Sequence, residues 1–86
     1  MGEYELRIKP SAVKEIERVP RIEDRQRIVG RIQALAEQPR PEGTTKLSGR
    51  EQYRIRQGSY RIVYSVDDAE RTVLVVKVGH RRDVYR

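Results

Sequence analysis

The 86-residue chain contains no cysteine, tryptophan or phenylalanine, and it has a single histidine. Without cysteine, a disulfide framework and a thiolate metal site are both excluded. The lone histidine, His80, also argues against catalytic zinc, which needs several protein ligands. Because phenylalanine and tryptophan are missing, the core is expected to consist of aliphatic side chains with some tyrosine. We expect neither a metal nor any other cofactor.

Long apolar runs are missing as well. None approaches the roughly 18 residues that a membrane-spanning helix needs, and residues 1–6 lack the basic and apolar regions of a signal peptide. These features predict a cytoplasmic protein that does not bind membranes. The length predicts one domain over residues 1–86, because a second domain would be too small to support its own core.

Positive charge is abundant, and it is unevenly distributed. Basic residues outnumber acidic ones by 19 to 13, which gives a net charge of +6. From Arg50 onward nine basic residues face five acidic ones, and all of the basic residues except Lys77 are arginine. Planar guanidinium groups bind phosphate with good geometry. The charge therefore favours a nucleic-acid partner, with a merely well-solvated basic surface as the alternative.

The periodicity of apolar residues predicts an α+β fold in the order β-α-α-β-β-β. We expect a twisted, mainly antiparallel sheet with a two-helix hairpin on one face. The first strand spans 4–8, the first helix is capped by Ser11 and stops at Pro20, and the second runs from about Arg21 to before Pro39. The apolar stripe of the second helix comprises Ile22, Ile28, Val29, Ile32, Leu35 and Ala36.

The second half of the chain is expected to consist mainly of strands. Residues 38–49 form a loop with a short ordered piece near Lys46. The last strand is apolar at nearly every position, which is typical of a central strand buried on both faces. The three strands predicted from β-branched and aromatic composition are Gln52–Gln57, Tyr60–Val66 and Thr72–Gly79.

A two-residue loop at Gly58 and Ser59 predicts a hairpin in which Arg56 lies directly opposite Arg61. Because side chains alternate across a strand, two tyrosines and two isoleucines share one face and three arginines share the other. Facing arginines disfavour strand pairing by a few tenths to about 1 kcal/mol. That cost indicates an anion site, with simple decoration of a solvated face as the alternative. The two sets are Tyr53, Ile55, Ile62 and Tyr64, and Arg54, Arg56 and Arg61.

These residue types suit metal-independent RNA cleavage, in which the 2′-hydroxyl attacks the neighbouring phosphorus. The reaction needs positive charge at the phosphorane, a base and an acid. Arginine supplies the charge but almost never gives up a proton. The remaining candidates for proton transfer are His80 and Tyr85, the latter only if arginines activate its phenol. Alternatively, His80 is structural, and Tyr85 stacks on an RNA base or packs on the core.

Three segments resemble the C-terminal signature of RelE-type toxins of the RelE/ParE toxin-antitoxin superfamily: 53–56, 58–64 and 78–86. Element order and length agree as well, so the resemblance covers essentially the whole chain. It implies an endoribonuclease that enters the ribosomal A site, cleaves the bound mRNA and thereby inhibits translation. It also implies a RelB-type antitoxin as partner, together with the ribosome carrying mRNA as target.

Carried over by position, the resemblance implies that Arg61 and Arg81 stabilise the scissile phosphate. Tyr85 would stack on the substrate base or assist proton transfer. Arg54 and Arg56 stand where the best-known members carry lysine, which restricts them to charge stabilisation. The family often continues past the position of Tyr85 into a helix that the antitoxin displaces, whereas only Arg86 follows Tyr85 here. We therefore expect the antitoxin to neutralise the toxin by occluding the basic face. Further candidate RNA contacts are Arg54, Arg56, Arg82 and Lys46.

Two other functions are compatible with the same sequence. ParE-like members of the superfamily poison DNA gyrase, but they lack the arginine set together with the late tyrosine. A non-catalytic module that binds RNA or the ribosome would also use a basic face. The arginines and Tyr85 favour the RelE type.

Overall fold

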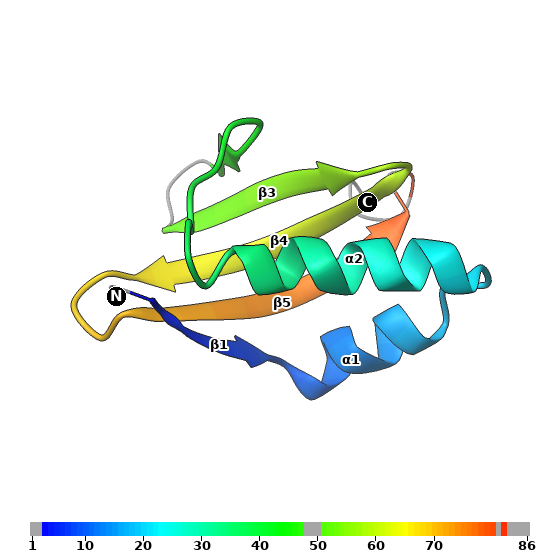
Figure 1. The fold of residues 1–86 in the computed structure, drawn as a ribbon, viewed down its shortest axis with the longest axis horizontal. Coiled ribbons are helices and arrows are strands. Elements are labelled where there is room, and N and C mark those ends of the chain that lie inside the picture. The colour runs from blue at the N-terminus through cyan, green and yellow to red at the C-terminus, as the bar shows by residue number, and fades with distance from the viewer. Residues whose placement is uncertain (1–2, 48–50, 81, 83–86) are drawn as a thin grey trace.

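The computed structural model describes residues 3–47, 51–80 and 82. Five strands form one sheet in the order β1-β5-β4-β3-β2, and two helices cover one of its faces (Figure 1). Only the pairing of β1 with β5 is parallel, so the predicted α+β fold with a mainly antiparallel sheet is confirmed. The elements are β1 (Glu5–Ile8), α1 (Pro10–Glu17), α2 (Ile22–Ala34), β2 (Thr45–Lys46), β3 (Gln52–Gln57), β4 (Tyr60–Asp67) and β5 (Thr72–His80).

Helix α1 begins one residue before the predicted cap. Lys9 occupies the N-cap position without a side-chain cap bond, and Pro10 is the first helical residue. Proline suits that position because its φ is already helical and its missing N–H would have no partner there. The prediction that Ser11 caps the helix was therefore wrong, whereas the end of the helix before Pro20 was correct.

The buried face of α2 is narrower than the predicted apolar stripe. Ile28 and Ile32 are buried, as is Leu35 just beyond the helix end. These residues follow the i, i+4, i+7 spacing of a single helix face. Ile22 is 57% exposed and Val29 37% exposed, because both lie off that line. The stripe was therefore predicted correctly in its centre and wrongly at its margins.

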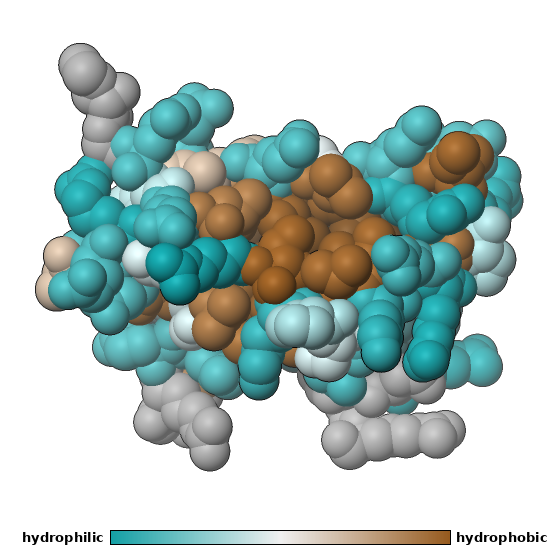
Figure 2. Space-filling model, turned by 90° about the horizontal axis from the view of Figure 1, so that it is seen from below, coloured by the Kyte–Doolittle hydropathy of each residue, from teal (hydrophilic) through white to brown (hydrophobic). Residues whose placement is uncertain are grey.

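The hydrophobic core lies between the helices and the sheet. Its members are aliphatic side chains and tyrosines, as the composition predicts, and Tyr64 is the largest fully buried one. Figure 2 shows an apolar area in the middle of the face formed by α1 and β1, bordered by polar side chains. Leu6 and Ile8 of β1 are only partly buried against the core, so the core reaches the surface on this side.

The register of the β3–β4 hairpin is the predicted one, with Arg56 opposite Arg61 and Tyr53 opposite Tyr64. Gly58 has φ +60°, which a type II′ turn requires at its first central position and which glycine adopts without strain. The hairpin therefore fixes which side chains point away from the helices.

Strand β5 is buried on one face and half-buried on the other, so the prediction of a strand buried on both faces was only partly correct. Val73 and Val75 face the helices, while Leu74 and Val76 are half-buried on the open side. The register between β4 and β5 shifts at Val63 and Tyr64, leaving Val76 as an extra residue. Such a bulge bends the strand locally.

A polar network ties the loop before β2 to the turn between β4 and β5. Arg40 donates hydrogen bonds to both carboxylate oxygens of Asp68, at 2.9 and 3.2 Å, and to the hydroxyl of Tyr53 at 3.0 Å. The Tyr4 hydroxyl donates to the same carboxylate at 2.6 Å. The hydrogen bond from Arg40, followed by that from Tyr4, lowers the pKa of Asp68. This network lies at the end of the sheet opposite to the Gly58 turn.

Within the described ranges, no helix combines the length and apolar character that crossing a bilayer would require.

Candidate functional site

Three arginines of the β3–β4 hairpin share the open face of the sheet. Arg56 and Arg61 are direct partners across the two strands, and Arg54 lies two residues earlier on β3. Directly opposed residues have side chains about 4.5–5.5 Å apart at their Cβ atoms. Arg56 is exposed, Arg54 is half-buried and Arg61 is buried, with only 6% of its surface accessible. The predicted cluster is therefore present, but one of its members is much less hydrated than a solvated face implies.

The side chain of Arg61 is buried, and the described residues compensate its charge only weakly. Its Nε has no hydrogen-bond partner, and its Nη1 donates one long bond of 3.4 Å to the carbonyl oxygen of Tyr60. In the part of the chain that the structure describes, neither Arg61 nor Arg56 forms an ion pair with a carboxylate. A buried, unpaired cation costs free energy unless something binds it. This arrangement is suited to an external anion.

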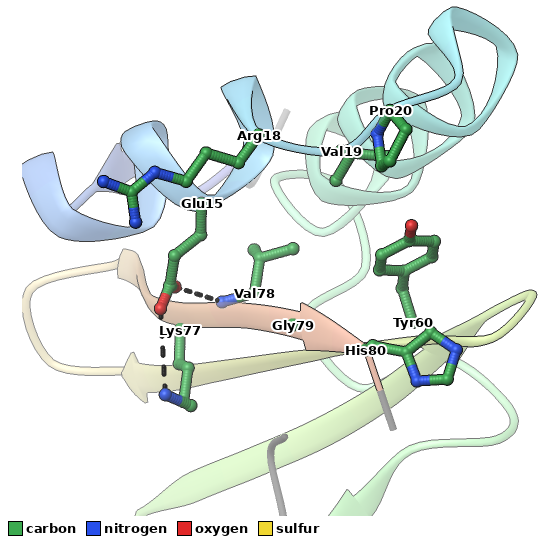
Figure 3. A pocket seen from close by; sticks show the side chains of 9 residues that line it. All are labelled: Glu15, Arg18, Val19, Pro20, Tyr60, Lys77, Val78, Gly79 and His80. Atoms are coloured by element: carbon green, nitrogen blue, oxygen red, sulfur yellow. Dashed lines mark hydrogen bonds and ion pairs between the residues drawn. The ribbon is translucent and has the colours of Figure 1, made fainter. Parts of the chain in front are cut away.

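His80 lies at the C-terminal end of β5, beside Tyr60. The two residues are partners across β4 and β5, and their rings meet edge to face at 5.7 Å. Alternation along β4 directs Tyr60 toward the helix side and Arg61 toward the open side. Figure 3 shows the two rings together at the end of the strands. The structure therefore brings His80 to Tyr60 and not into the arginine group.

Lys46 is likewise separate from the arginines. It lies opposite Tyr53, whose side chain faces the helices, and its Nζ is 3.6 Å from a carboxylate oxygen of Glu51. Arg82 is exposed, and its backbone N–H donates a long bond of 3.4 Å to Nδ1 of His80. Arg81 and Tyr85 lie outside the described residues, so their convergence on the arginine face stays a prediction.

The residues that the sequence did not single out line a cavity of about 330 Å³ next to His80. Glu15 lies in α1, Arg18 is the C-cap residue of that helix, and Tyr60 and Lys77 come from the strands (Figure 3). Glu15 Oε1 accepts the backbone N–H of Val78 at 2.8 Å. The sequence offers one hint, because Tyr60 and His80 each directly precede an arginine that was predicted to bind the phosphate. That they line one cavity with Glu15 depends on tertiary packing, which the sequence does not reveal.

The open-face arginines could bind one phosphate group from two adjacent strands. Guanidinium groups donate paired hydrogen bonds to phosphate oxygens and keep their charge at any physiological pH. The extra negative charge of a phosphorane would be stabilised more strongly near a poorly hydrated cation than near an exposed one. Within the described ranges, no three potential metal-ligating side chains lie together.

Comparison with known proteins agrees with this geometry. Residues 6–85 match the family described as the ParE toxin of type II toxin-antitoxin system, parDE. Toxin RelG of Mycobacterium tuberculosis is 48% identical over 31 residues, so the match spans about a third of that relative, 36% of its length and 36% of this chain.

Solved structures resemble the chain over nearly its whole length. The free state of an E. coli toxin RelE with two arginines replaced by alanine is 32% identical, with a TM-score of 0.77 over 96% of this chain and 90% of that one. The toxin in the intact E. coli RelBE toxin-antitoxin complex is 29% identical, with a TM-score of 0.77 over 90% and 95%. The chain therefore belongs to the RelE/ParE superfamily of type II toxin-antitoxin toxins, and within it to the RelE type.

Proposed function

We propose that this toxin is a metal-independent endoribonuclease that cleaves mRNA in the ribosomal A site and thereby inhibits translation. The observation that carries the proposal is the buried guanidinium of Arg61, which lies opposite Arg56 without a carboxylate partner among the described residues. A sequence selected for stability alone would place an apolar or pairing side chain there. The cost is offset when a phosphate binds.

In this mechanism Arg61 and Arg81 hold the scissile phosphate and stabilise the charge that develops on it. Removal of one such contact typically costs about 2–4 kcal/mol of transition-state stabilisation. Arg54, Arg56 and Arg82 would bind flanking phosphates. Lys46 is a weaker candidate because Glu51 lies 3.6 Å from its ammonium group.

Proton transfer is assigned to His80 or Tyr85, and the two roles remain alternatives. His80 contacts Tyr60 on the side away from the arginines, so proton transfer by His80 requires the RNA to pass round the end of β4 from the arginine face. Tyr85 would either stack on a base of the bound codon or take the 2′-hydroxyl proton. A weak base implies that the ribosome supplies much of the substrate geometry, because positioning alone can account for a large part of the barrier.

The partner that controls this activity is proposed to be a RelB-type antitoxin. The E. coli relative is known in a RelBE toxin-antitoxin complex. An acidic antitoxin segment would neutralise the open-face arginines directly, because Arg56 is exposed and has no ion pair among the described residues. Occlusion of this kind requires no displaced helix.

Mapping of mRNA 5′ ends after induction of the chain in cells tests the proposal. Codon-positioned cuts are expected on translated messages, and they should be lost with Arg61→Ala but kept with Arg27→Ala, which removes an exposed α2 arginine. DNA breaks without mRNA cuts would instead identify a ParE-like gyrase poison. Protection of A-site mRNA from chemical probing without any cut would identify a non-catalytic binding module.

A further inference from the structure

We infer that the cavity between α1 and the C-terminal end of β5 is a nucleotide subsite, which holds the RNA nucleotide next to the scissile phosphate. The inference rests on the proposed function and extends it to a second face of the molecule. The cavity measures about 330 Å³, within the range of about 300–1,000 Å³ that is typical of small-ligand sites. It has an aromatic end and a charged end.

The aromatic end suits a base. Tyr60 projects from β4 toward Pro20 and Val19 in the turn between the helices, and the ring of His80 lies beside it (Figure 3). Tyr60 is half-buried, so part of its ring remains accessible. Bases stack on tyrosine and histidine without strong sequence preference, because every base has a π-face.

The charged end suits a phosphate. Glu15 is already engaged, because Oε1 accepts the N–H of Val78 at 2.8 Å and Oε2 lies 3.7 Å from Nζ of Lys77. Its negative charge is thus largely compensated. Arg18 is exposed, and its side chain makes no hydrogen bond or ion pair within the described ranges, so this end retains an excess positive charge.

The cavity exists because β1 is short. Pairing of β1 with β5 stops at Ile8 and Val75, and the chain continues from there into α1 at Pro10. Beyond Val75 no strand covers this edge of β5 in the described structure, and the side chain of Glu15 bonds the N–H of Val78 instead. Among the described residues, the edge therefore stays open to a ligand.

The cavity and the arginine face meet at the same end of the sheet. Tyr60 and Arg61 are consecutive in β4, and alternation points one into the cavity and the other onto the open face. A single RNA strand that rounds the end of β4 would place a phosphate at Arg61 and the neighbouring nucleotide at Tyr60. Binding at both places would fix the register of the RNA relative to the cleaved bond.

The binding test uses the full ¹⁵N-labelled chain and a trideoxynucleotide, which cannot be cleaved because it lacks the 2′-hydroxyl. Amide shifts are expected at Tyr60, Val78 and His80 as well as at Arg61. Arg18→Gln should weaken binding about fivefold, as expected for one partly screened charge contact, whereas Arg18→Lys should retain it. The matched control, Arg27→Gln, removes an exposed arginine that lies outside the cavity and should bind like the wild type.

The second readout is the pattern of cuts on ribosome-bound mRNA. Arg18→Gln is expected to spread the cuts over more positions, because the cavity fixes the register of the RNA relative to the cleaved bond, while Arg27→Gln does not. Shifts confined to the open face, or an Arg18→Gln variant that matches the control in both assays, would overturn the subsite. A wild type that binds in the cavity but never cuts RNA would support the subsite and refute the proposed nuclease.

Discussion

Replacement of Arg61 by methionine should make the protein more stable and inactive at the same time. Arg61 is 6% exposed, its Nε lacks a partner, and among the described residues its guanidinium makes a single hydrogen bond, which is 3.4 Å long. Methionine keeps a flexible, unbranched side chain, shorter than that of arginine, without the charge. The variant removes a buried cation from a site where it contributes little to folding.

The expected increase in the free energy of unfolding of Arg61→Met follows from two contributions. Loss of the like-charge pair with Arg56 relieves up to about 1 kcal/mol, and removal of an unsatisfied buried polar group relieves about 1–3 kcal/mol. Allowing for lost contacts of the side chain, we expect the free energy of unfolding to rise by about 1–3 kcal/mol. For a domain of this size, each 1 kcal/mol raises Tm by about 4–8 °C.

Urea unfolding followed by far-UV circular dichroism measures this change directly, and Arg27→Met is the matched control because Arg27 is exposed on α2. The control should lie within about 0.5 kcal/mol of the wild type. A less stable Arg61→Met variant would refute the reasoning, since it would mean that the guanidinium is well compensated in the free protein.

Three further outcomes are expected. Tyr64→Phe should lower the free energy of unfolding by about 1 kcal/mol in urea titrations, because the buried hydroxyl donates a 2.6 Å hydrogen bond to the carbonyl of Pro39. Because Arg40 lowers the pKa of Asp68, the ionised carboxylate stabilises the folded protein at neutral pH, and this stabilisation is lost as pH falls below about 4. Asp68→Asn should therefore lose less stability on acidification than the wild type. Ribosome affinity should fall steeply with salt in filter-binding assays, as phosphate contacts do, and a flat response would contradict the electrostatic account.

Local sequence signals predicted most of the fold. The glycine-serine turn and the alternation of arginine with tyrosine and isoleucine sufficed for the β3–β4 register, which placed Arg56 opposite Arg61. The bounds of the four predicted strands were correct to within a residue because β-branched runs end at clear turn residues, whereas β2 was predicted only as a short ordered piece of a loop. The predicted cap of α1 was wrong because Pro10 and Ser11 are both common at the start of a helix, and only the backbone conformation shows that the helix begins at Pro10.

The sequence predicted the arginine cluster of the candidate site but not the residues that surround it. The burial of Arg61 and the side taken by His80 depend on how β4 and β5 pack against neighbours distant in sequence. Lys46 was predicted to contact RNA, but the pairing of β2 with β3 places it on the side of Tyr53, away from the arginines. The cavity at Glu15 arises from α1 and β5, which are separated by most of the chain.

Single-turnover cleavage of mRNA on programmed ribosomes tests the central claim most directly, with wild type, Arg61→Ala and the control Arg27→Ala compared at saturating toxin. The account predicts a rate reduced by more than about tenfold for Arg61→Ala, which corresponds to one lost transition-state contact, and an unchanged rate for the control. Equal rates for all three proteins would contradict the assignment of Arg61 to the scissile phosphate.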